Sequence, residues 1–112
     1  MNPQQATSIN ELVKEAHQNA INKDFWSASQ NIGEKLMLIN TELSEFFEAY
    51  RRDNLKPDEH CPTFTNQTVE LADVLIRIFD LAGWLHMNNL GDAVVEKMRY
   101  NTTRSSLHGK KF

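Results

Sequence analysis

The sequence predicts an all-α fold, a small four-helix bundle that is completed by oligomerisation, and three observations support this. Apolar residues recur at helical spacing in four segments, and none of the segments alternates as a strand would. The 112 residues include four glycines and three prolines, which is too few for a turn-rich β-sandwich. A chain of this length forms one domain, residues 1–112, whose basic tail covers about residues 105–112.

The first two helices have start signals of their own. Ser8 and Glu11 form a capping box, so the first helix is expected to begin at Ser8 and to end near Asp24. Asn31 is a candidate N-cap for a second helix over about residues 31–52, which carries a single apolar stripe.

The third helix, over about residues 65–86, is apolar nearly all round, so we expect it in the middle of the core. The fourth helix is expected over about residues 89–103. Exposed Phe47, Trp84 and Leu85 would suit burial against a second copy, and we therefore expect a homodimer or a homotetramer.

Charge is unevenly distributed along the chain. The 15 acidic and 12 basic side chains sum to −3, yet residues 97–112 carry five bases and no acid. The acidic balance argues against a nucleic acid polymer as partner. The basic block is either a solvated tail or an anion-binding element that folds over an acidic site.

Location follows from what the sequence lacks. No apolar run is long enough for a membrane span, and residues 1–10 are too polar for a secretory signal. A single cysteine excludes a disulfide framework within one chain. We expect a cytoplasmic protein that does not bind membranes.

Two pairs of carboxylates are the candidate metal ligands. Glu42 and Glu45 lie three residues apart on the second helix, and Glu70 and Asp73 do so on the third. The loop between these helices returns the chain antiparallel, so the two pairs can face each other. Two carboxylates about 4 Å apart repel by about 4 kcal/mol at an effective dielectric near 20. The cluster therefore calls for a hard divalent cation, Mg²⁺ first and Mn²⁺ second.

The third helix strengthens this interpretation. Its charged residues Glu70, Asp73, Arg77 and Asp80 form one line on an otherwise apolar helix, and such a line must be wet, paired or bound to metal. The plainer alternative is a solvated face. A di-iron carboxylate site would need Glu-x-x-His pairs, which the sequence does not contain.

Basic residues near the C-terminus are candidates for binding phosphate groups. Lys97, Asn101 and Arg104 share one face of the fourth helix, and Lys110 follows in the tail. Lys35 lies two turns before the first carboxylate pair and is a further candidate. Alternatively, these residues are surface cations that complement the helix dipole.

Aromatic residues after the first helix could contact a base. Trp26 is a candidate for stacking, with His17 and Asn19 near it, although packing is the commoner role of such residues. Cys61 has no visible base partner, so a nucleophilic role is not expected.

Three strings together resemble the MazG-like nucleotide pyrophosphohydrolases of the all-α NTP pyrophosphatase superfamily. They are Glu42-Leu-Ser-Glu45, Glu70-Leu-Ala-Asp73, and the ending that runs from Lys97 to Lys110. The resemblance covers about residues 8–111, and the acidic motif occurs once, so the tandem form of the family is not expected.

The resemblance implies hydrolysis of (deoxy)nucleoside triphosphates between the α and β phosphates, which yields a monophosphate and pyrophosphate. It also implies Mg²⁺ on the four carboxylates and an oligomer with active sites near subunit boundaries. Both a housecleaning role and a role in pool control stay open. We expect Glu45 or Glu42 to accept the proton of the attacking water. Two alternatives are a non-enzymatic helical dimer that acts as an interaction or regulatory module, and a nucleic-acid binder that uses the basic tail.

Overall fold

The computed structural model describes residues 3–27 and 31–112, and the regular structure in these ranges is helical apart from one isolated bridge between Pro57 and Thr65. Within these ranges no helix is both long and apolar enough to cross a membrane. The elements are α1 (Pro3–Asn22), α2 (Ile32–Arg51), α3 (Asn66–Trp84), α4 (Leu90–Asn101) and a 3₁₀ turn, Ser106–Gly109. The predicted all-α class is confirmed.

Local sequence signals explain two of the helix starts. The side chain of Asn31 accepts a hydrogen bond of 3.1 Å from the backbone N–H of Glu34, and Thr65 caps α3 in the same way. The predicted start at Ser8 is wrong, because α1 already begins at Pro3 and Ser8 lies inside it. Proline suits the first turn, since its φ angle is preset for a helix and no N–H is needed there.

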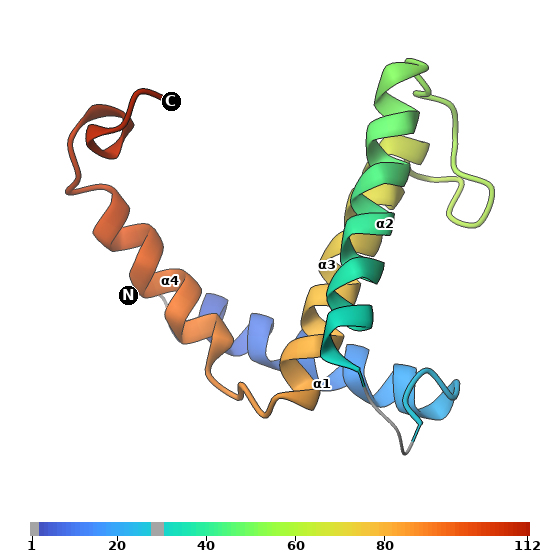
Figure 1. Ribbon diagram of the computed structural model, residues 1–112, viewed down its shortest axis with the longest axis horizontal. Coiled ribbons are helices and arrows are strands. Elements are labelled where there is room, and N and C mark those ends of the chain that lie inside the picture. The colour runs from blue at the N-terminus through green and yellow to red at the C-terminus, as the bar shows by residue number, and fades with distance from the viewer. Residues whose placement is uncertain (1–2, 28–30) are drawn as a thin grey trace.

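The four helices form two arms (Figure 1). Helices α2 and α3 run antiparallel and pack along each other to make one arm. Helix α1 crosses the base of that arm and packs against α3, while α4 packs on α1 and extends away as the second arm. The chain by itself therefore has an open V shape rather than a closed four-helix bundle.

Glycines allow the helices to meet where they cross. A Cβ atom on Gly91 would collide with the carbonyl oxygen of Ala6, so only glycine lets α4 approach α1 this closely. The backbone N–H of Gly91 donates a 2.8 Å hydrogen bond to the side chain of Asn10. Gly83 likewise brings α3 against His17 on α1.

The buried core of the single chain is small. The predicted burial of the third helix is not met within one chain, because Leu71 and Leu75 on α3 are 46% and 50% exposed. Phe47 and Leu85 are exposed as predicted, whereas Trp84 is half-buried. The buried hydrophobic residues in the described ranges are mostly small: Ala6, Val13, Ala49, Val74 and Ala82. A helix as apolar as α3 remains largely uncovered because, among the described residues, the helices that pack closely on it are α1 and α2.

Candidate metal centre and adjoining pocket

Three of the four predicted metal ligands come together midway along the α2–α3 arm. Glu42, Glu45 and Glu70 each offer a carboxylate oxygen, and these oxygens all lie within 4.8 Å of one another. The i, i+3 spacing puts both α2 carboxylates on the face toward α3. Glu42 and Glu70 are half-buried, while Glu45 is exposed.

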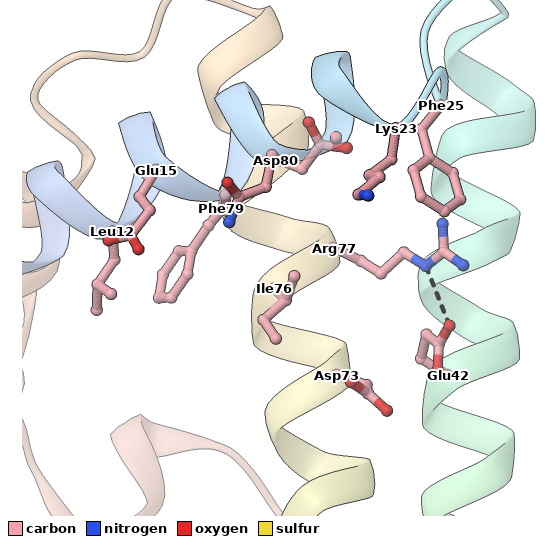
Figure 2. Close-up of a pocket in the computed structure, with 13 residues that line it drawn as sticks. Leu12, Glu15, Lys23, Phe25, Glu42, Asp73, Ile76, Arg77, Phe79 and Asp80 are labelled. Carbon is pink, nitrogen blue, oxygen red and sulfur yellow. Dashed lines mark hydrogen bonds and ion pairs between the residues drawn. The ribbon is translucent and has the colours of Figure 1, made fainter. Parts of the chain in front are cut away.

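Asp73 belongs to the same electrostatic group, although it is not one of these three. It projects from α3 toward α2 (Figure 2). Burial raises its pKa, and the charges of Glu42, Asp58 and Glu45 raise it further. Burial also raises the pKa of Glu70, with the charges of Glu45 and Asp73 adding to the effect. The four side chains therefore repel one another, as the helical spacing predicted.

Among the described residues, Arg77 is the cation that forms an ion pair with this cluster. Its Nε donates a 3.0 Å hydrogen bond to Glu42, and the Glu42 side chain is 14% exposed (Figure 2). The guanidinium carbon also lies 5.6 Å from the centroid of the Phe25 ring. Arg77 was identified from the sequence as part of the charged line, but its role as the anchor of Glu42 was not.

Asp58 is a carboxylate that sequence reasoning missed. It is only 5% exposed, and it accepts hydrogen bonds from the backbone N–H groups of His60 and Cys61 and from Asn66 Nδ2 at 3.0 Å. Burial alone would raise its pKa, but these hydrogen bonds hold the pKa below its ordinary value. Asn66 also donates to Glu70 at 3.4 Å, which links the loop to the cluster. The Pro57-Asp58 turn signal was the available clue.

A pocket of about 520 Å³ opens beside the cluster, between α1 and α3 (Figure 2). Three lining residues connect the pocket to the cluster. Glu42 and Asp73 belong to the carboxylate cluster, and Arg77 pairs with Glu42. The volume lies within the range of small-molecule sites, about 300–1,000 Å³. The remaining lining residues are mostly apolar: Leu12, Ala16, Ala20, Phe25, Ile76 and Phe79. The polar ones are Glu15, Asn19, Lys23 and Asp80.

The residues predicted to stack on a base make contacts within the chain. Asp80 Oδ1 accepts a 2.8 Å hydrogen bond from Trp26 Nε1 and lies 2.8 Å from His17 Nδ1. The Trp26 ring stacks on Trp84, with centroids 5.1 Å apart. Lys35 Nζ lies 4.4 Å from the Trp26 centroid and donates to a backbone carbonyl, so Lys35 is placed beside Trp26. Base stacking stays a prediction.

The predicted phosphate-binding residues of α4 lie apart from the carboxylates. Lys97 Nζ and the Arg104 guanidinium are 4.8 Å and 5.7 Å from the ring centroid of Tyr100. Arg104 lies outside the helix, because α4 ends at Asn101 rather than near residue 103 as predicted. The Oδ1 atom of Asn101 is buried and has no hydrogen-bond partner within residues 3–27 and 31–112. The end of α4 and the tail with Lys110 lie across the open V from the α2–α3 arm (Figure 1).

Comparisons with protein-family models, with curated proteins and with solved structures found no match for the chain. The class of the protein is therefore described by its fold and by the geometry of its site. Over the described residues the chain is helical, and a carboxylate cluster on two antiparallel helices borders a pocket of about 520 Å³.

Proposed function

We propose that this protein is a metal-dependent nucleoside triphosphate pyrophosphohydrolase that cleaves between the α and β phosphates. The observation that carries the proposal is the carboxylate cluster at the edge of a pocket of about 520 Å³. A nucleoside could occupy the apolar part of such a pocket while its phosphates approach the acidic side chains.

The donor atoms of the cluster suit Mg²⁺. Glu42, Glu45 and Glu70 offer only carboxylate oxygens, with Asp73 beside them, and hard divalent cations prefer such ligands. Their mutual repulsion also gives the cluster a reason to bind a cation. A bound Mg²⁺ would supply charge stabilisation to phosphate oxygens and lower the pKa of a water molecule.

Residues of the chain are proposed to act as the general base and to neutralise the leaving group. Glu42 is held by Arg77, whereas Glu45 forms no hydrogen bond or ion pair with other described residues and is exposed. Glu45 is therefore the better placed of the two predicted bases to take a proton from water. Water adds to the α-phosphorus, the bond to the bridging oxygen breaks, and pyrophosphate leaves. Lys97 and Arg104 are proposed to neutralise the pyrophosphate.

A substrate panel tests the proposal. We expect canonical and modified nucleoside triphosphates, incubated with the protein and Mg²⁺, to release pyrophosphate and a monophosphate. Release of orthophosphate alone would overturn cleavage between the α and β phosphates.

Substitutions within the cluster test the assignment of residues. Glu45→Gln and Asp73→Asn should each reduce turnover at least about 100-fold while the fold remains intact. Glu48→Gln is the matched control, because Glu48 lies one turn further along α2 and pairs with Arg52 at 2.6 Å instead. Circular dichroism would check the fold, and Mn²⁺ binding measured by electron paramagnetic resonance should weaken only in the cluster variants. Normal turnover in both cluster variants, or no metal binding by the wild type, would favour the interaction-module alternative.

A further inference from the structure

The loop that joins α2 to α3 is built around a buried carboxylate. The isolated bridge between Pro57 and Thr65 closes the loop. Inside it, the backbone N–H of Asp58 donates a 2.9 Å hydrogen bond to the carbonyl oxygen of Phe64. Asp58 is 5% exposed and is the one buried charged residue within the described ranges. A buried carboxylate is costly unless hydrogen bonds replace its hydration, so its oxygen atoms need donors.

Both oxygen atoms of the Asp58 side chain have such donors. Oδ2 accepts hydrogen bonds of 2.9 Å and 3.0 Å from the backbone N–H groups of His60 and Cys61. Oδ1 accepts a 3.0 Å hydrogen bond from Nδ2 of Asn66, the first residue of α3. The loop backbone therefore fixes the Asp58 carboxylate, and this carboxylate presents one oxygen atom to α3.

Asn66 links Asp58 to the carboxylate cluster. Its Nδ2 also donates to Oε1 of Glu70, one turn further along α3, at 3.4 Å. Its Oδ1 accepts a 3.1 Å hydrogen bond from Nδ2 of Asn54. An amide donates only from nitrogen and accepts only at oxygen. The reverse orientation would turn the amide oxygen toward two carboxylates, so one orientation of the Asn66 amide satisfies all three contacts.

The contact with Asn66 restrains the Glu70 carboxylate. Glu70 offers one of the three carboxylate oxygens that lie within 4.8 Å of one another. The terminal torsion of a glutamate is otherwise broad, so a hydrogen bond to one of its oxygens limits how the carboxylate turns. Partners that orient metal ligands in this way commonly change metal affinity about 10- to 100-fold. The orientation of Glu70 therefore depends on a residue that is not itself in the cluster.

We propose that Asp58 and Asn66 are positioning residues of the candidate metal centre: Asp58 fixes the Asn66 amide, and Asn66 orients Glu70 for a divalent cation. The shorter hydrogen bond, to Asp58, holds the amide in place, and the longer one orients the Glu70 carboxylate. The inference rests on the proposed function for the use of the cation, but cation binding can be measured without any substrate.

Manganese binding tests the contribution of Asn66. Mn²⁺ prefers the same oxygen ligands as Mg²⁺, and its free concentration can be followed by electron paramagnetic resonance during a titration. Asn66→Ala should weaken Mn²⁺ binding about 10-fold or more, because Glu70 loses the donor that orients it. Thr68→Ala is the matched control, since Thr68 lies in the same first turn of α3 but its side chain contacts Thr65 at 2.9 Å. Unchanged affinity in Asn66→Ala, or an equal loss in the control, would overturn the inference.

A double-mutant cycle tests whether Asp58 acts through Asn66. Asp58→Asn keeps the shape of the side chain but removes the carboxylate that fixes the Asn66 amide, so it should weaken Mn²⁺ binding in the otherwise wild-type chain. In the Asn66→Ala background the same substitution should change the affinity by less than about twofold. A direct effect of the Asp58 charge on the cation would make the two losses add, and additive losses would overturn the inference. Circular dichroism would check that each variant is folded, and Asn66→Ala with its control decides the inference if Asp58→Asn is unfolded.

The substrate panel is a separate measurement. A wild type that binds Mn²⁺ but releases no pyrophosphate would refute the proposed function, while the Mn²⁺ titrations would still decide the positioning role. Hydrolysis by the wild type together with unchanged Mn²⁺ affinity in Asn66→Ala would support the proposed function and refute the positioning role.

Discussion

Individual carboxylates in this protein have opposite electrostatic environments. Burial and like charges raise the pKa of Asp73 and Glu70, so the folded chain favours their protonated forms. Hydrogen bonds lower the pKa of Asp58 despite burial, and a hydrogen bond from Arg52 lowers the pKa of Glu48. The first pair destabilises the fold when ionised, and the second pair stabilises it.

The stability of the metal-free protein should show this difference. A raised carboxyl pKa means that the folded state holds more protons than the unfolded state. The stability that these carboxyl groups contribute to the fold is therefore lost as pH rises from about 4 toward neutrality. We expect wild type to lose stability relative to Asp73→Asn over that range in chelated buffer. Urea unfolding at several pH values would measure it, and Mg²⁺ should restore stability at neutral pH. A pH-independent difference between the two proteins would contradict the assigned repulsion.

Asp80 is expected to hold the α1 end of the site in place. It bonds both His17 and Trp26, so Asp80→Asn should cost about 1–3 kcal/mol in the free energy of unfolding. Asp92→Asn is the control, since Asp92 accepts one exposed hydrogen bond from Asn10. Equal losses in the two variants, measured by urea unfolding, would refute this role.

Among the helices, the positions of α2 and α3 along the chain could be predicted well, but the burial of their apolar side chains could not. The start of α2 follows from the Asn31 cap within one turn, and the carboxylate pairs of both helices follow from i, i+3 spacing. The predicted start of α1 at Ser8 is wrong because Ser8 and Glu11 match a capping box, whereas the helix begins earlier, at Pro3. The apolar surface of α3 indicated a core helix, but a hydrophobic pattern does not say which chain covers it.

Packing of α4 on α1 depends on one glycine. Gly91→Ala would press a Cβ atom into the backbone of Ala6 and should cost at least about 1–3 kcal/mol of stability. Gly33→Ala is the control, because the nearest atom there is a side-chain oxygen of Asn31 at 3.2 Å. Thermal unfolding should show a lower midpoint for Gly91→Ala alone. An unchanged midpoint would mean that the two helices can separate without cost.

For the molecule as a whole, the V shape leaves the chain with a small core and a large exposed apolar area. If association supplies the missing burial, the folded state is favoured by mass action. The thermal midpoint of wild type should therefore rise with protein concentration, whereas that of Leu75→Glu should be lower and nearly constant. Calorimetry over a hundredfold range of concentration would measure this, and a constant wild-type midpoint would argue against association.

The helical class, the cap of α2 and the pairing of acids along each helix follow from the sequence alone, because they depend on residues within a few positions of one another. Tertiary structure decided the rest: that Arg77 holds Glu42, that Asn66 links Asp58 to Glu70, and that the basic end of α4 lies across the V. These features depend on contacts between residues far apart in the chain, such as Gly91 against Ala6, and no local pattern encodes such contacts.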